Sequence, residues 1–207
     1  MNDTRAPGQR AGLSQEAVLA ASWDLLNLGG TSALTMRALA RLLGVSPNAV
    51  YSYVANKTDL LDLLLDDLLS TVSVPPPDID DPVAGLADLM TSTYQILTSH
   101  PDLVPLYLKR QGARGPHAIR LGVVMDDLLD RAGVDSAGAA QARRALIIHT
   151  IGSAAFATGA SVDTVSDGPF ALEQASSTFD RSLGWLLSGA TQTIDRHDAP
   201  TAEVTSR

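Results

Sequence analysis

The chain has 207 residues, of which 45% are apolar, and a formal net charge of −8. This composition supports one or two domains with a buried core and is not that of a disordered chain. Cysteine is absent, which excludes disulfide frameworks, thiolate zinc sites and cysteine nucleophiles. The longest apolar stretches are interrupted by polar residues and are too short to span a membrane. We therefore expect a soluble, cytoplasmic protein without a membrane partner, and the acidic charge taken alone argues against nucleic acid.

The acidic charge is distributed unevenly along the chain. Residues 1–59 carry five basic and four acidic side chains, whereas residues 60–207 carry 10 basic and 19 acidic ones. The first segment is therefore close to neutral, and the excess of acid lies in the second. Such an asymmetry is a reason to interpret the two segments separately.

The sequence predicts an all-α fold of about nine helices. Apolar residues recur at three- and four-residue spacing, no strand alternation is sustained, and glycine or proline separates the periodic runs. Ser14 and Asn56 are placed as helix N-caps, and the proline run that follows Val74 cannot be helical. The expected helices lie at residues 14–28, 35–43, 46–54, 56–70, 82–99, 102–111, 116–132, 136–158 and 170–189.

Residues 34–53 have the pattern of two short helices that meet across a three-residue turn. Ala40 is small where the helices cross, Gly44 follows where the chain turns, and Val50 supplies part of the shared core. This spacing is typical of a helix-turn-helix, whose second helix lies in the major groove of B-DNA. A simple αα-corner without DNA contacts is the alternative, because it uses the same small residues.

The surface of the second of these helices favours contact with DNA. Its exposed positions between residues 46 and 52 are small or polar. Arg37 can reach a phosphate or a guanine edge, and the hydroxyl of Tyr51 can hydrogen-bond a phosphate. Tyr53 and Lys57 can also hold phosphates. Their alternatives are a half-buried scaffold residue and an ordinary solvated charge.

Two runs of residues carry a family resemblance. They are Leu34-Thr35-Met36-Arg37-Ala38-Leu39-Ala40 and Tyr51-Ser52-Tyr53-Val54-Ala55-Asn56-Lys57-Thr58-Asp59-Leu60-Leu61. Through them, residues 14–69 resemble the N-terminal domain of the TetR (tetracycline repressor) family of bacterial transcriptional regulators. The resemblance implies a homodimer whose two recognition helices enter successive major grooves of a palindromic double-stranded operator. Half-site centres would then lie about 34–36 Å apart, or a multiple of that distance.

Carried over position by position, the resemblance implies which residues contact DNA. Phosphate contacts are implied for Thr35, Ser46, Tyr51, Tyr53 and Lys57, and base-edge contacts for Arg37, Pro47, Asn48 and Ala49. Pro47 and Ala49 offer little hydrogen-bonding capacity. We therefore expect Arg37 and Asn48 to carry most of the sequence readout.

We divide the chain into six segments that together make a DNA-binding head and a regulatory body. A ligand in the body is expected to tilt the bridging helix and so to change the separation of the two recognition helices. The segments are a flexible arm at 1–13, a helix-turn-helix DNA-binding domain at 14–56, a bridging helix at 57–71, a Pro-rich connector at 72–81, a regulatory, ligand-binding and dimerisation domain at 82–193, and a polar tail at 194–207.

The helices near 136–158 and 170–189 are the expected dimer interface. The first carries many alanines together with Gly152 and Ser153, and small residues permit close helix approach. The second adds large apolar residues, including Trp185. The family resemblance implies that both helices pair with their copies in the partner to form a four-helix bundle. Burial within the core of a single chain is the alternative.

A small-molecule effector of unknown identity is expected to bind among the helices between residues 82 and 158. Apolar walls with a few polar groups are typical of such sites. Ordinary core packing is the alternative for these residues, and for His149 a place in the dimer interface is another. The candidate ligand contacts are Met90, Tyr94, Leu97, Tyr107, Gln111, Met125, Leu129, His149 and Ser153.

No catalytic residue, cofactor or metal site is expected. The sequence has no nucleophile elbow, phosphate-binding loop, Rossmann fingerprint, Ser-x-x-Lys or His-Glu-x-x-His motif. The region around His100 does not reproduce the metal-and-drug loop of the tetracycline-binding family members, and His100 is expected to cap a helix C-terminus instead. Three acidic sets without defined loop geometry are expected to form solvated faces. These sets are Asp62, Asp66 and Asp67; Asp78, Asp80 and Asp81; and Asp126, Asp127 and Asp130.

The sequence therefore predicts a ligand-responsive DNA-binding transcriptional regulator and not an enzyme. We expect a repressor that binds a palindromic operator as a dimer and is released by a small molecule. An all-α protein–protein interaction adaptor without DNA binding is the alternative.

Overall fold

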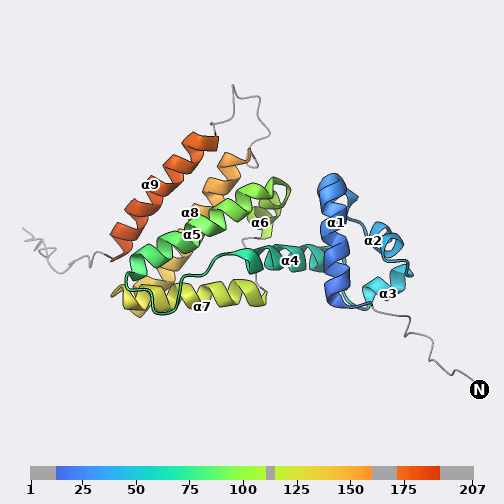
Figure 1. Ribbon diagram of the computed structural model, residues 1–207, viewed down its shortest axis with the longest axis horizontal. Coiled ribbons are helices and arrows are strands. Elements are labelled where there is room, and N and C mark those ends of the chain that lie inside the picture. Colours follow the sequence, from blue (N-terminus) through green and yellow to red (C-terminus); the bar gives the residue numbers. More distant parts are fainter. Residues whose placement is uncertain (1–12, 111–114, 160–171, 192–207) are drawn as a thin grey trace, which may run out of the picture.

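Figure 1 shows an elongated molecule in which α4 joins a small N-terminal head to a larger body. The structure is a computed structural model and describes residues 13–110, 115–159 and 172–191. Over these ranges the chain forms nine α-helices and no strand, which confirms the predicted all-α fold. The helices are α1 (Gln15–Ala33), α2 (Met36–Leu42), α3 (Pro47–Tyr51), α4 (Lys57–Leu68), α5 (Pro82–Ser99), α6 (Val104–Arg110), α7 (Pro116–Arg131), α8 (Ser136–Ala157) and α9 (Leu172–Thr191).

Side-chain caps fix where the four helices of the head and bridge begin. Each helix follows a residue whose side-chain oxygen accepts the backbone N–H three positions later, over 3.0–3.3 Å. Each of these hydrogen bonds satisfies an amide that has no partner within the first turn. The local sequence therefore determines these helix starts. The capping residues are Ser14, Thr35, Ser46 and Asn56.

Two helices are shorter than the sequence predicts. α3 ends at Tyr51 and not at residue 54, because the chain turns at Ser52 and becomes extended at Asn56 (φ −163°) to cap α4. α6 begins at Val104 and not at residue 102, because Pro101–Leu103 form a 3-10 turn. The periodicity of apolar residues continues through both places, so it does not reveal these ends.

The bridging helix α4 belongs to two hydrophobic cores. Leu60 and Leu64 are fully buried in the core of the head. Leu65 and Leu68 of the same helix are buried in the core of the body. Because protein interiors are close-packed, a tilt or rotation of α4 repacks both cores at once.

The body is arranged around α5, which packs against α7, α8 and α9. α8 and α9 lie side by side at one end of the molecule (Figure 1). The connector after α4 is fastened to the body, since the N–H of Ser73 donates to Ser92 Oγ over 2.9 Å and Arg131 donates to the carbonyl of Pro77 over 2.9 Å. None of the described helices has the length and apolar character of a membrane span.

Candidate nucleic-acid interface and ligand cavity

The predicted DNA contacts lie along the starts of α2, α3 and α4 and in the turn after α3. Eight of the nine side chains are exposed, and the remaining one, Ala49, is half-buried. Their side chains do not build the head core, so this surface is open to an external partner. The exposed residues are Thr35, Arg37, Ser46, Pro47, Asn48, Tyr51, Tyr53 and Lys57.

Three of these polar side chains have no hydrogen-bond partner within the described part of the chain. They are Arg37, Asn48 and Tyr51, and the Tyr51 side chain is 48% exposed. A guanidinium, an amide and a phenol that remain unpaired are donors suited to base edges and phosphate oxygens. Among the predicted DNA contacts, these three residues have the strongest geometric support.

Two other predicted contacts already hold the head together. The Tyr53 hydroxyl donates to the carbonyl of Leu13 over 2.5 Å, and Lys57 Nζ donates to the carbonyl of Thr31 over 3.0 Å. Tyr53 therefore ties the chain just before α1 to the turn after α3, but it is 40% exposed, whereas the scaffold alternative expects a half-buried residue. A phosphate contact by either residue requires that its present hydrogen bond be exchanged.

The body contains a cavity of about 490 Å³ bordered mainly by α5, α6, α7 and α8. Its volume lies within the range of roughly 300–1,000 Å³ that is usual for small-molecule sites. Four of the predicted ligand contacts line it, namely Met90, Leu97, Tyr107 and Met125. Helical periodicity finds the apolar face of a helix but not which residues border empty space, so several other wall residues were not predicted from the sequence. The missed polar residues are Thr93, Asp126, Arg143 and Thr150.

Within the described part of the chain, the other predicted ligand contacts are not part of this wall. The ring of Tyr94 stacks on Phe179 with a centroid distance of 4.2 Å. His149 also stacks on Phe179, and a hydrogen bond of 3.0 Å joins His149 Nε2 and Ser182 Oγ between α8 and α9. Leu129 is buried in the body core, Ser153 is half-buried on α8, and Gln111 lies outside the described residues.

The polar part of the cavity wall contains an ion pair and a poorly bonded hydroxyl. Arg143 on α8 pairs with Asp126 on α7 through Nη1 and Oδ2. The hydroxyl of Thr150 is buried, and its hydrogen bond goes to Met90 Sδ at 3.5 Å. Thioether sulfur is a weak acceptor. The wall therefore combines apolar surface with an arginine that is paired through Nη1 and a threonine hydroxyl whose acceptor is weak.

Two residues of the cavity wall are hydrogen-bonded to α4. Tyr107 on α6 donates its hydroxyl to the carbonyl of Leu65. In the first turn of α7, the N–H of Ala118 donates to Asp66 Oδ1 over 2.9 Å, and the N–H of His117 donates to Asp66 Oδ2 over 3.1 Å. Asp66, a residue of α4, thus caps the N-terminus of α7. Consecutive residues of the bridging helix are in this way attached to the cavity.

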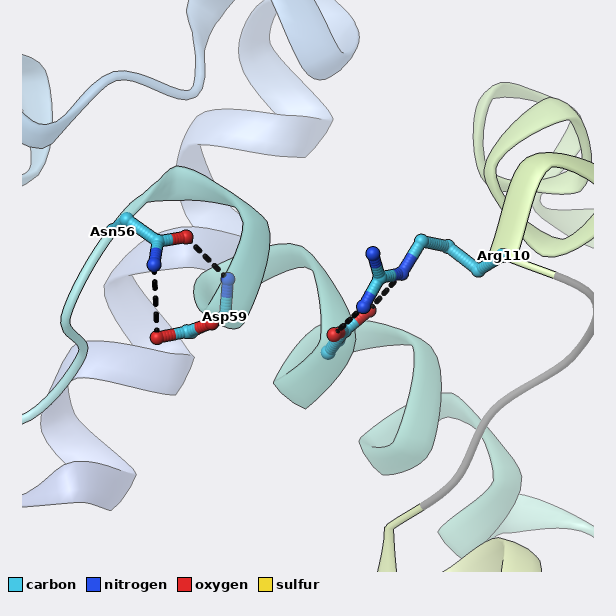
Figure 2. Close-up of polar contacts among 4 residues, drawn as sticks. Asn56, Asp59 and Arg110 are labelled. Carbon is cyan, nitrogen blue, oxygen red and sulfur yellow. Dashed lines mark hydrogen bonds and ion pairs between the residues drawn. The ribbon is translucent and has the colours of Figure 1, made fainter.

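A third attachment is an ion pair between α6 and α4 (Figure 2). Arg110 Nε donates to Asp62 Oδ1 over 2.7 Å, and Arg110 Nη2 donates to Asp62 Oδ2. This two-pronged geometry fixes the orientation of both side chains. Figure 2 also shows the reciprocal cap between Asn56 and Asp59 at the start of the same helix. Polar contacts therefore hold α4 at its start and again at Asp62, midway along the helix.

The two buried tyrosines of the body differ in their hydrogen bonding. Burial and, secondly, the negative charge of Asp66 raise the pKa of Tyr107 well above its ordinary value, so the hydroxyl remains a donor to Leu65. Burial and, secondly, Asp180 also raise the pKa of Tyr94. The Tyr94 hydroxyl is buried without a hydrogen-bond partner in the described part of the chain. Of these two hydroxyls, only that of Tyr107 attaches α4 to the cavity wall.

The prediction that Asp62, Asp66 and Asp67 form a solvated face is wrong. Asp66 is buried and caps α7, Asp62 pairs with an arginine of α6, and Asp67 accepts the indole N–H of Trp23 over 2.7 Å. These partners lie 44 to 52 residues away in the sequence, so no local pattern reveals them.

The predicted C-terminal cap at His100 is present, since its Nδ1 lies 3.1 Å from the carbonyl of Ile96.

Comparison with known proteins agrees with this arrangement. Residues 18–64 match the family described as bacterial regulatory proteins, tetR family. The tetracycline repressor protein class C of Escherichia coli is 30% identical over 174 residues, which cover 83% of this chain and 78% of the relative. The chain belongs to the TetR family. As a member of this family it is a DNA-binding transcriptional regulator with a helix-turn-helix head.

Further proteins are similar over most of this chain. An HTH-type transcriptional regulator of Saccharopolyspora erythraea is 32% identical over 145 residues, which span 68% of this chain and 59% of that relative. A TetR variant from Acinetobacter baumannii, solved in complex with minocycline, has a TM-score of 0.71 at 26% identity, over 86% of this chain and 96% of that one. ActR from Streptomyces coelicolor, solved in complex with actinorhodin, shares the fold with a TM-score of 0.75 at 23% identity, over 87% and 96% of the two chains.

Proposed function

We propose that this TetR-family regulator is a repressor that binds a palindromic operator as a homodimer and is released by a small molecule in the 490 Å³ cavity. The observation that carries this proposal is the double attachment of α4. The helix is bonded to the cavity wall at Leu65 and Asp66, and it is packed into the head core through Leu60 and Leu64. A change at the cavity wall is therefore transmitted to the head by a single rigid element.

The proposed switch works through α6 and the first turn of α7. A ligand that displaces Tyr107 or Ala118 shifts the hydrogen bonds to α4 and tilts that helix. The tilt changes the distance between the two recognition helices of a dimer. A ligand can move this equilibrium only by its difference in affinity for the two forms.

The dimer interface is proposed on the outer face of α8 and α9. Ile148 and Phe156 on α8 and Trp185 on α9 are 64%, 66% and 70% exposed. Large apolar side chains exposed on two adjacent helices are typical of a subunit interface. The acidic excess of residues 60–207 helps to keep the body away from the phosphates, while the nearly neutral head contacts DNA.

An electrophoretic mobility shift with the DNA that flanks the chain's own gene tests the proposal. We expect retardation of this DNA by the full chain and none of a shuffled fragment of equal length in the presence of excess competitor. Asn48→Ala is expected to reduce the preference for the flanking fragment, because the Asn48 side chain is exposed at the start of α3 and has no hydrogen-bond partner among the described residues. An interaction adaptor retards neither fragment, and that result would contradict the proposal.

A further inference from the structure

We propose that the effector is an apolar molecule with a carboxylate at one end, and that Arg143 binds this carboxylate. The inference rests on the proposed function, because it assigns a chemical class to the ligand of the same cavity. Most of the cavity wall is apolar, with Leu97, Leu121 and Ile151 among its residues. An apolar wall provides few partners for water and favours an apolar ligand body.

Two polar residues of the wall, Arg143 and Thr150, make few or weak hydrogen bonds within the described part of the chain. Arg143 uses Nη1 for Asp126, and its other N–H groups have no hydrogen-bond partner within the described part of the chain. The Thr150 hydroxyl is buried against the weak acceptor Met90 Sδ. By contrast, the Thr93 hydroxyl donates to a backbone carbonyl over 2.8 Å and is already satisfied. The unpaired N–H groups of Arg143, whose side chain is 38% exposed, are available to acceptor atoms of a ligand. The buried Thr150 hydroxyl has only a weak acceptor, which a ligand oxygen could replace.

The arrangement along α8 sets the geometry of such a ligand. Arg143, Ile147 and Thr150 follow each other at helical spacing, and all three line the cavity. At a rise of about 1.5 Å per residue, Arg143 and Thr150 are separated by roughly 10 Å along the helix axis. The apolar Ile147 lies between them. A ligand with a carboxylate at Arg143 and an apolar body along Ile147 matches this order.

A carboxylate fits Arg143 better than an alcohol or an ammonium group does. The guanidinium presents parallel N–H donors that bind both oxygens of a carboxylate, and a hydroxyl satisfies fewer of them. Asp126 occupies Nη1 only, and a Cβ placed at Gly122 would lie 3.9 Å from that atom, so no α7 side chain at this position covers the guanidinium. An ammonium group is repelled by Arg143 and meets an Asp126 that is already paired.

Isothermal titration calorimetry of the full chain with three matched probes tests this assignment. The probes are dodecanoate, 1-dodecanol and dodecylammonium, each kept below the concentration at which it forms micelles or separates from water. We expect dodecanoate to bind roughly tenfold more tightly than dodecanol, and dodecylammonium to bind most weakly. Arg143→Gln is expected to remove the preference for the acid and to leave the affinity for the alcohol unchanged.

Arg144→Gln is the matched control. Arg144 is exposed, is the next residue of α8 and does not line the cavity, so its substitution changes the net charge equally and should keep the preference. Asp126→Asn provides a second test that retains Arg143. It removes the negative charge beside the guanidinium and is expected to tighten dodecanoate binding.

Three results would overturn the assignment of Arg143. They are a preference for dodecanoate that survives Arg143→Gln, tighter binding of dodecylammonium than of dodecanoate, and no binding of any probe. The gel shift with flanking DNA is independent of these probes. A regulator whose effector belongs to another chemical class still retards that DNA, so failure of this inference is distinguishable from failure of the proposed function.

Discussion

Asp66 accepts the backbone N–H of Ala118 over 2.9 Å, although the two residues belong to different helices. The residue before α7 is Gly115, which has no side-chain oxygen, and the bridging helix supplies the cap instead. A Cβ at Gly115 would collide with the Asp66 carboxylate. The glycine and the aspartate are therefore matched, and together they fasten α4 to the wall of the ligand cavity.

Replacing Asp66 by alanine is expected to lower the free energy of unfolding by about 1–3 kcal/mol. The substitution leaves two N–H groups at the start of α7 without their acceptor, one of them on Ala118. Urea denaturation followed by circular dichroism at a fixed chain concentration measures the change. Asp130→Ala, a substitution of an exposed aspartate on α7, is the control for lost charge. If both variants lose the same free energy of unfolding, the cap contributes nothing to stability.

The two buried tyrosines allow the contribution of one hydrogen bond to the free energy of unfolding to be measured, because only Tyr107 has a partner for its hydroxyl in the described residues. Tyr107→Phe removes the donor to Leu65 and is expected to cost about 0.5–1.5 kcal/mol of unfolding free energy at neutral pH. Tyr94→Phe is expected to be neutral or stabilising, because the hydroxyl that it removes is buried without a partner in the described residues. The same denaturation experiment compares them. A larger loss for Tyr94→Phe would contradict this assignment of roles.

Alkaline pH should reduce the stability difference between wild type and Tyr107→Phe. Burial holds the folded-state pKa of Tyr107 above the ordinary value near 10, so the folded protein keeps a proton that the unfolded chain releases. The stabilisation is complete below about pH 10 and declines as the pH rises above that value. We therefore expect the stability difference between wild type and Tyr107→Phe to shrink between pH 10 and about 12. A constant difference over this range would indicate that Tyr107 does not titrate differently in the two states.

Tyr51→Phe is expected to weaken DNA binding by roughly 0.5–1.5 kcal/mol, which is the contribution of one hydrogen bond. Tyr51 is exposed and unpaired among the described residues, so its hydroxyl is available to a phosphate. Because phosphates carry no sequence information, the loss should be similar on specific and non-specific fragments. Fluorescence anisotropy titration at one salt concentration measures it. Unchanged affinity would remove Tyr51 from the interface.

Trp185→Glu is expected to convert a dimer into a monomer. The indole is 70% exposed on α9, which packs against α8, where Ile148 and Phe156 are also exposed. A charge at this position opposes burial against a second copy. Sedimentation should then change from twice the chain mass to 21.7 kDa. Leu28→Glu, a change at an equally exposed apolar residue in the head, is the control and should leave the dimer intact. A wild-type monomer at micromolar concentration would exclude the proposed interface.

The head shows how much of a binding surface can be predicted from sequence. Thr35, Ser46 and Asn56 act over three residues, and the turn at Gly44 (φ +65°) requires the left-handed conformation that glycine adopts without strain. Short-range rules of this kind determine where helices start and turn. They do not reveal that Tyr53 and Lys57 are bonded within the head, because Leu13 and Thr31 lie 40 and 26 residues away.

The sequence by itself determined an all-α chain with a helix-turn-helix head, because capping and helical periodicity are local interactions. Only the tertiary structure decided how the body is used. It joined Asp66 to Ala118 across 52 residues and Arg143 to Asp126 across 17, and it decided which residues of the predicted ligand-binding helices border a cavity. The physical reason is that polar groups are satisfied, and volumes filled, by whichever residues the packed helices bring together.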